Sequence, residues 1–398
     1  MPLHFEFRTR SIGLQRVHVF AWSGGTFLAE LALEVSVSSG GDTVDAPTKA
    51  APMTQVNSNA GEVTLQVLQV GDGYLFQFLS EPFISEATST GSFAADPDIT
   101  AEQAIAQMHD LAADESPYSE NMARKALRAR GMALWNKLVP ADIRDHFWQL
   151  RPSIKSFSIA AQKDTIPWEM LYPAQGSTEE GFLVEQFPVT RRVHNQPRIP
   201  YVNLDGVRFV VPPHAPSDAV TEVNAIQRIV GSDRGPASVI SDLNQLLGLV
   251  EDGHLGLTHF ACHNTYDLKK GGSSIAMGGG PFVPDLLEPA VSRTSLATNR
   301  PLVFINACRS AGAAPHYTQT IGWAQQFMAA GAGAFIGTLW DVRSDSARTF
   351  AEAFYHAMKS GQTLGEAAKQ ARLTTARHSS DPTWLAYTVY GDPAALTR

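Results

Sequence analysis

The sequence predicts an α/β fold in which a mostly parallel sheet is covered by helices on both faces. Two observations support this fold class. From about residue 153 onward, short apolar runs alternate with segments of helical periodicity. These runs are almost continuously apolar, which is typical of parallel strands that are buried on both faces. With 44% hydrophobic residues in 398, the chain can also bury a large core.

A β-rich N-terminal domain is expected over residues 1–95, as a possible regulatory or interaction module. Its candidate strands are Arg16–Phe20, Phe27–Val37, Val63–Val70 and Tyr74–Leu79. The Gly71-Asp72-Gly73 sequence between the last two strands is a hairpin signal. The polar tract between Ser38 and Gly61 contains few large apolar residues and is expected to be a long loop.

A helical connector is expected over residues 96–150, because the apolar period there becomes that of a helix. Thr100-Ala101-Glu102-Gln103 fits a capping box and should begin the first helix. A second helical pattern runs from about Tyr118 to Leu138. The connector should join the N-terminal domain to the α/β domain of residues 151–398.

The elements of the α/β domain follow from apolar runs, helical periodicity and capping residues. In chain order we expect a strand at Ser156–Ala161, a buried aromatic segment at Ile166–Tyr172, a strand at Val207–Val211, a helix at Ala219–Val230, a strand at Val239–Ile240, a helix at Leu243–Val250, a strand ending at His263, a hairpin of Ser274–Met277 and Phe282–Val283, a strand ending at Cys308, a helix at Thr320–Ala330, a strand at Ala334–Leu339, and helices at Ser344–Met358 and Leu364–Arg377. Ser241 or Asp242 should cap the helix from Leu243, and Thr363 should begin a capping box.

Charge and cysteine content exclude several classes of function. A net charge of −8 and an isoelectric point near 5.8 argue against nucleic-acid and membrane partners. Residues 310–340 carry no Lys, Arg, Asp or Glu, but Pro315, His316 and several glutamines and glycines interrupt any membrane-spanning run. The N-terminus has no signal-peptide pattern, and there are only two cysteines, so a cytoplasmic location is expected.

Two predicted strands each end in a reactive side chain, His263 and Cys308. If the strands are parallel neighbours, both residues emerge at the sheet edge where open α/β sheets bind ligands. A histidine beside a cysteine can generate a thiolate nucleophile, so we interpret the pair as catalytic. The backbone N–H groups of Cys308 and Asn264 would then stabilise the oxyanion. Either residue alone is more often structural, since free cysteines and satisfied histidines are common in cores.

Other site types are weaker candidates. His259 and His263 have the spacing of metal ligands on a helix, but they lie in a strand-like run and are too few for a zinc site. Cys262 should point to the opposite face of its strand, into the core. The Gly278-Gly279-Gly280 run lacks the residues of a phosphate-binding loop, and no serine-hydrolase elbow is present. We therefore expect neither a metal nor a cofactor.

Five segments in order resemble the CHAT domain, a caspase-like peptidase family related to separases. They are Ile166–Pro173, Thr258–His263, Phe304–Ala311, Gly337–Val342 and Trp384–Pro393. The resemblance covers residues from about 153 to the C-terminus. It implies a caspase-like fold and cysteine endopeptidase activity, with the catalytic dyad falling on His263 and Cys308. The family usually has glycine after the catalytic histidine, where this chain has Asn264.

The same resemblance implies where the substrate would bind. The segment from Thr338 to Val342, which contains Trp340 and Asp341, should line the pocket for the P1 side chain. Asp341 would accept a basic P1 residue, whereas Arg309 or Arg343 would favour an acidic one, and each of the three could instead form a surface ion pair. Asp267 could reach the cleft or cap its own loop.

Many family members are effectors in bacterial defence or cell-death pathways that remain inactive until a partner or attached module senses a signal. A protein substrate and an activating protein partner are therefore implied. Two other functions stay open. One is a non-enzymatic interaction module, suggested by Asn264 and by the β-rich N-terminal region. The other is a small-molecule transferase or hydrolase that uses the same thiolate.

Overall fold

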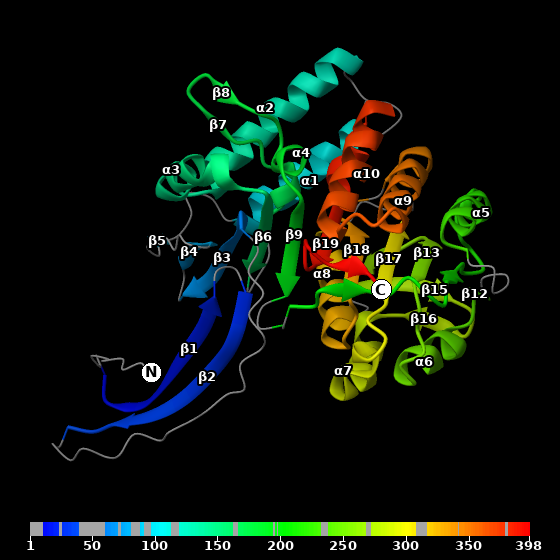
Figure 1. The fold of residues 1–398 in the computed structure, drawn as a ribbon, viewed down its shortest axis with the longest axis horizontal. Helices are drawn as coiled ribbons and strands as arrows, with labels where there is room; N and C mark the ends of the chain where they lie inside the picture. Colours follow the sequence, from blue (N-terminus) through cyan, green and yellow to red (C-terminus); the bar gives the residue numbers. More distant parts are fainter. Residues whose placement is uncertain are drawn as a thin grey trace.

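A mostly parallel, 11-stranded sheet runs through the molecule and confirms the predicted fold class (Figure 1). The computed structural model describes residues 11–23, 26–39, 60–70, 73–80, 88–90, 97–112, 119–161, 166–193, 196, 198–231, 238–267, 272–307, 317–340, 342–378 and 381–398. Across the sheet the strands are β12 (Ser238–Ile240), β11 (Arg208–Val210), β13 (Thr258–Cys262), β17 (Leu302–Ala307), β18 (Ala334–Thr338), β19 (Tyr387–Gly391), β9 (Val189–Val193), β6 (Ser156–Ala161), β3 (Glu62–Val70), β4 (Gly73–Ser80) and β5 (Thr88–Thr90).

Nine of the eleven strands form two parallel blocks that run in opposite directions, and β4 and β5 extend the second block by antiparallel pairing. In the first block, β12, β11, β13, β17 and β18 are parallel to one another. In the second block, β19, β9, β6 and β3 are parallel. The blocks meet where β18 and β19 pair antiparallel, with Thr338 opposite Tyr387. The carboxyl ends of the first block and the amino ends of the second therefore share one edge of the sheet.

Helices cover both faces of the first block, as predicted (Figure 1). One face carries α5 (Ala219–Val230), α9 (Ser344–Lys359) and α10 (Leu364–His378), and the other carries α6 (Leu243–Glu251), α7 (Glu288–Arg293) and α8 (Tyr317–Ala329). Successive side chains of β17 point to opposite faces of the sheet, which explains why the strand contributes to both cores. Phe304 packs in one core with Phe350 of α9, whereas Val303 and Ile305 pack in the other with Phe327 of α8.

The second block packs against the helices of the predicted connector. These are α1 (Pro97–Ala112), α2 (Glu120–Leu138) and α3 (Ala141–Leu150), and the short helices α4 (Leu183–Gln186) and α11 (Thr383–Ala386) lie nearby. Phe147 of α3 makes edge-to-face contacts with Trp135 of α2 and Phe157 of β6, at ring-centroid distances of 5.2 and 6.3 Å. Such pairs add to the free energy already gained by burying the rings.

The N-terminal strands belong to two different sheets. β1 (Gly13–Ser23) and β2 (Thr26–Val37) form a separate antiparallel hairpin, which extends from the body of the molecule (Figure 1). β3 and β4 form the predicted hairpin, and β3 also pairs with β6 inside the main sheet. The predicted domain boundaries at residues 95 and 150 stay a prediction. The predicted loop from Ser38 to Gly61 lies mostly outside the described residues.

Several boundaries differ from the expected ones for clear physical reasons. Helix α1 begins at Pro97 rather than at a Thr100 cap, because proline is tolerated in the first turn of a helix. Asp242, and not Ser241, caps α6, since its carboxylate accepts from the N–H of Gln245 at 3.1 Å. Thr363 accepts from the N–H of Glu366 at 3.3 Å and so begins α10 as predicted.

Small two-stranded sheets complete the fold. They are formed by β7 (Ala174–Gln175) with β8 (Thr178–Glu179), and by β10 (Tyr201–Val202) with β20 (Leu396–Thr397). Within the described part of the chain, no helix is long and apolar enough to cross a membrane.

Candidate active site

The two predicted catalytic residues follow directly on neighbouring strands of the first block. β13 and β17 are parallel and adjacent, and their last residues, Cys262 and Ala307, are register partners. His263 comes next after β13 and is partly buried. Cys308 comes next after Ala307 in the chain and lies outside the described residues. What the structure does describe is the pair of strand ends that lead into it.

Asn264 occupies the predicted oxyanion position without backbone strain. Its side chain is buried and hydrogen-bonds to Ser273, with Nδ2 at 3.1 Å from the hydroxyl. The non-glycine residues with positive φ in the described ranges are Thr294 and Arg300, so the backbone of Asn264 is not left-handed. A residue with a side chain is therefore compatible with this loop.

A small three-stranded sheet follows Asn264. It contains β14 (Thr265–Asp267), β15 (Gly272–Met277) and β16 (Gly280–Phe282), so the predicted hairpin is confirmed and gains a third strand. The backbone of Asp267 ends β14, opposite Gly272. The Asn264 to Ser273 hydrogen bond ties the residue after His263 to this sheet.

Among the predicted substrate-binding residues Trp340, Asp341 and Asp267, Trp340 is the one whose side chain the structure describes. Trp340 is only 1% exposed and packs in the core that joins the second block to α11. Its neighbour Leu339 donates its N–H to the carbonyl of Ala386, at 2.8 Å. Asp341 lies outside the described residues. Arg343 pairs with Asp345 at 3.4 Å, an ion pair near the surface.

Cys262 lies in an environment that suppresses thiol reactivity. Its side chain is fully buried in the core on the α6, α7 and α8 face, as predicted. Burial raises the pKa of the Cys262 thiol well above its ordinary value, and the nearby carboxylate of Glu222 raises it further. Cys262 therefore remains a neutral thiol at physiological pH.

A buried polar network that was not predicted lies between the two strands and the helices that cover them. His259 Nε2 is 2.6 Å from Glu222 Oε1, and His259 Nδ1 is 3.1 Å from the Tyr355 hydroxyl. Asn306 Nδ2 donates to the same Glu222 oxygen at 2.6 Å, and the Tyr387 hydroxyl donates to Asn306 Oδ1 at 2.7 Å. All five side chains are buried. The network joins α5, β13, β17, α9 and β19.

The sequence contains a signal for this network that is visible in retrospect. Glu222 lies on the apolar face of α5 with Val223 and Ile226, where a carboxylate is expensive to bury unless it is paired. His259 and Asn306 are likewise polar residues inside apolar strands. His259, considered above as a metal ligand, is instead occupied by Glu222 and Tyr355.

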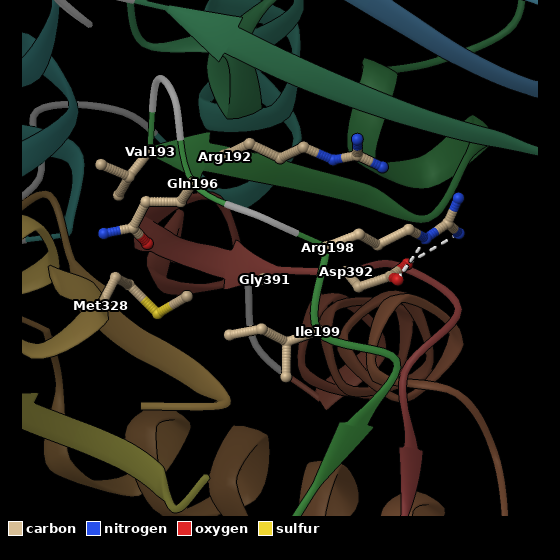
Figure 2. Close-up of a pocket in the computed structure, with 8 residues that line it drawn as sticks. All are labelled: Arg192, Val193, Gln196, Arg198, Ile199, Met328, Gly391 and Asp392. Atoms are coloured by element: carbon tan, nitrogen blue, oxygen red, sulfur yellow. Dashed lines mark hydrogen bonds and ion pairs between the residues drawn. The ribbon is translucent and has the colours of Figure 1, made fainter. Parts of the chain in front are cut away.

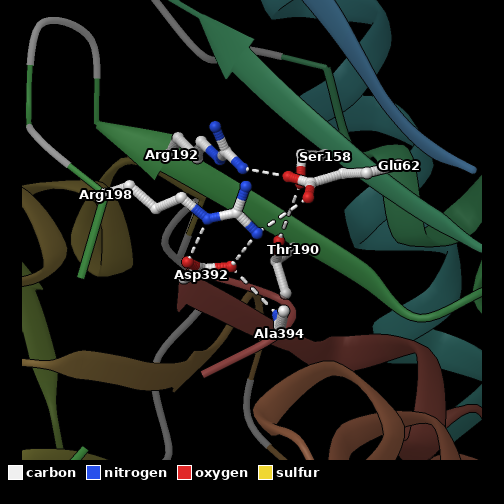
Figure 3. Close-up of polar contacts among 7 residues, drawn as sticks. All are labelled: Glu62, Ser158, Thr190, Arg192, Arg198, Asp392 and Ala394. Atoms are coloured by element: carbon white, nitrogen blue, oxygen red, sulfur yellow. Dashed lines mark hydrogen bonds and ion pairs between the residues drawn. The ribbon is translucent and has the colours of Figure 1, made fainter. Parts of the chain in front are cut away.

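A second buried polar cluster joins the start of β3 to the end of β19 (Figure 3). Glu62 pairs with Arg192 at 2.5 Å and with Arg198 at 2.7 Å. Arg198 also pairs with Asp392, which directly follows β19. Two arginines thus face two carboxylates, and the cluster has no net charge. We call these four residues the cross-brace.

The cross-brace borders a small cavity, which its two arginines line together with Gln196, Met328 and other residues (Figure 2). The cavity has a volume of about 30 Å³, which is room for about one water molecule. Because it is this small and its cations are already paired, it is not a candidate substrate site. The candidate site is the edge where β13 and β17 end.

The overall arrangement is similar to that of two solved structures of the Saccharomyces cerevisiae separase–securin complex. The alignments have TM-scores of 0.52 and 0.50 at 10% and 11% sequence identity. They cover 85% and 84% of this chain but 30% of the separase chain in each case, so the similarity is one of fold. Comparison with the curated proteins finds no match.

A family model described as the CHAT domain matches residues 128–392, and this is more than half of the chain. The matched range contains both strand ends of the candidate site, and it begins within α2, before the predicted boundary at residue 151. Taken together with the separase-like fold, the match establishes that the chain belongs to the CHAT domain family and has the fold of caspase-like cysteine peptidases.

Proposed function

We propose that the protein is a cysteine endopeptidase that uses His263 and Cys308 as a catalytic dyad. The observation that carries the proposal is the register of β13 and β17, in which Cys262 and Ala307 are partners. Adjacent strands lie about 4.8 Å apart, so side chains that follow paired strand ends are within reach of each other. Membership of the CHAT family supports a peptidase over other thiolate chemistry.

The proposed reaction proceeds through an acyl-enzyme. His263 takes the proton of the Cys308 thiol, and the thiolate attacks the peptide carbonyl carbon. Backbone N–H groups of Cys308 and Asn264 stabilise the oxyanion. His263 then returns the proton to the leaving amine, and the C–N bond breaks. Water, deprotonated by His263, hydrolyses the thioester and releases the second product.

We further propose that a protein partner regulates this activity, as part of a bacterial defence or cell-death pathway. The solved separase structures are complexes with securin, which is a protein partner of that enzyme. In this chain, the β1–β2 hairpin extends from the body and offers a place for a partner to bind (Figure 1). We also propose that Asp341 or Asp267 sets the preference for the P1 side chain of the substrate, whereas Trp340 supports this segment from the core.

A peptide-library assay with the purified protein tests the proposal. The assay is run with and without candidate activating proteins. Cleavage should disappear in Cys308→Ala and in His263→Ala while both variants keep the thermal unfolding profile of the native protein. Rapid alkylation of Cys308 near neutral pH should accompany activity, because only an activated thiolate reacts quickly. Full cleavage by a folded Cys308→Ala variant would exclude the dyad.

A further inference from the structure

The polar network beside β13 and β17 has a geometry that bears directly on the candidate dyad. One oxygen atom, Glu222 Oε1, receives a contact from each strand, at 2.6 Å from His259 on β13 and at 2.6 Å from Asn306 on β17. The carboxylate therefore joins two adjacent strands through their side chains. No other described carboxylate is hydrogen-bonded to side chains of both strands.

The two contacts lie shortly before the proposed catalytic residues. His259 precedes His263 by four residues, and Asn306 precedes Cys308 by two. Two residues of chain span at most about 7 Å, so a displacement of Asn306 moves the point at which the chain enters Cys308. The Tyr387 hydroxyl holds the other end of the Asn306 amide at 2.7 Å, which fixes its orientation.

We propose that Glu222 and Asn306 are positioning residues, which hold the ends of β13 and β17 in the register that brings His263 and Cys308 together. This inference rests on the proposed peptidase function. Glu222 acts from α5 through His259 and Asn306, and neither Glu222 nor Asn306 takes part in bond making or breaking.

A purely stabilising role does not account for the residue types. A buried ionic or polar group can often be replaced by well-packed apolar residues without loss of stability, whereas its directional hydrogen bonds specify one arrangement. Here α5, β13, β17, α9 and β19 already share an extensive apolar core. The directional hydrogen bonds of the polar network also fix how these elements are oriented relative to one another. They do so near the edge of the sheet where we propose catalysis.

A hydrogen-bond swap tests the proposal. Asn306→Asp places a second carboxylate against Glu222, and the repulsion should displace the end of β17. The double variant Glu222→Gln/Asn306→Asp has one amide and one carboxylate again, with donor and acceptor exchanged and the same net charge. The measurement is the rate of Cys308 alkylation as a function of pH, made on the full chain alongside peptide cleavage.

Asn306→Asp should slow alkylation and cleavage by about 10- to 100-fold, because small displacements of reacting groups have effects of this size. Its alkylation profile should also shift to higher pH, since a thiolate held further from His263 is less stabilised. The double variant should recover most of both rates. If Asn306→Asp proves unfolded, Tyr387→Phe provides a milder test, because it removes only the hydroxyl that orients Asn306 and should lower both rates by a smaller factor.

The matched control is Thr190→Val, which removes a buried hydrogen bond of 3.3 Å to Ser158 in the second block. It should lower thermal stability but leave the alkylation profile of Cys308 unchanged. An unchanged profile in folded Asn306→Asp or Tyr387→Phe, or an equal shift in Thr190→Val, would overturn the positioning role. By contrast, a native Cys308 that reacts no faster than a free thiol would overturn the peptidase proposal itself.

Discussion

At the scale of single residues, the two cysteines of this chain are expected to behave oppositely. Cys262 is fully buried, and its thiol pKa is raised by burial and by Glu222. Cys308, by proposal, is activated by His263. A single labelling experiment on the native protein can therefore report on both residues without mutation.

Iodoacetamide near neutral pH should modify Cys308 and leave Cys262 unmodified, because only the thiolate form reacts and Cys262 is both neutral and inaccessible. Peptide mass spectrometry measures the modification at each position. Unfolding in urea before labelling is the control and should expose Cys262. Modification of Cys262 in the native protein would contradict the described environment.

Asn264 permits a second prediction at this scale. Asn264→Gly should lower the free energy of unfolding by about 1–2 kcal/mol, because it removes the hydrogen bond to Ser273 and adds freedom to the unfolded chain. Urea unfolding measures the change. Ser273→Ala should have little further effect in the Asn264→Gly background, and simple additivity of the two changes would show that the hydrogen bond contributes nothing.

At the scale of elements, α10 carries a buried charge that its surroundings barely satisfy. Arg372 is fully buried, and its Nη2 donates to the carbonyl of Tyr387 at 2.9 Å, whereas its Nε and Nη1 have no hydrogen-bond partner among the described residues. Burial lowers the pKa of Arg372 to about 10. Nearby, Arg191 and Glu169 already form a complete ion pair, with Nε 2.9 Å from Oε1.

Arg372→Met should therefore leave stability unchanged or raise it, since a buried charge is replaced by an apolar chain of similar length. Glu169→Gln should lower stability by about 3–5 kcal/mol, because it leaves Arg191 and Arg372 buried without a carboxylate. Thermal and urea unfolding of the two variants provide the comparison. A larger loss of stability in Arg372→Met than in Glu169→Gln would contradict the view that the charge of Arg372 is dispensable and the carboxylate of Glu169 is required.

The elements also show how far the sequence predicts this fold. The apolar strands β13, β17 and β18 were predicted because burial on both faces leaves a continuous apolar run. β9 was not predicted, because Arg191 and Arg192 interrupt its apolar pattern. Their charges are neutralised by Glu169 and Glu62, which are distant in sequence. Partners of this kind are known only once the fold is known.

The candidate site was predictable to a similar extent. Strand ends, and hence the positions of His263 and Cys308, follow from local patterns. The contacts of Glu222 do not, because they depend on α5 crossing two strands that are 37 and 84 residues further along the chain. Local periodicity contains no information about such contacts.

At the scale of the whole molecule, the cross-brace connects segments that are far apart in the sequence. Glu62 begins β3, and Asp392 directly follows β19, with Arg198 bound to both (Figure 3). Strand β3 of the N-terminal region is thus held to the family domain by buried charges as well as by its pairing with β6.

Glu62→Gln should lower the free energy of unfolding by about 3–5 kcal/mol, because it leaves Arg192 and Arg198 with too few carboxylates in a buried place. Hydrogen exchange should show the earliest loss of protection in β3 and β4. The control is Glu34→Gln, which breaks an exposed pair with Arg16 on the β1–β2 hairpin and should be nearly neutral. Equal effects of the two changes would mean that the cross-brace is not a structural connection.

The antiparallel pairing of β18 with β19, which joins the two blocks, has a consequence for the order in which the sheet forms. β19 is the last strand of the large sheet to be synthesised, yet it lies at the centre, between β18 and β9. Until residues 387–391 have left the ribosome, the blocks can form only as two separate sheets, each with an unpaired edge. Closure by β19 is then a late and strongly non-local step, of the kind that slows folding. The two blocks of a nascent chain would thus remain separate until β19 has been synthesised.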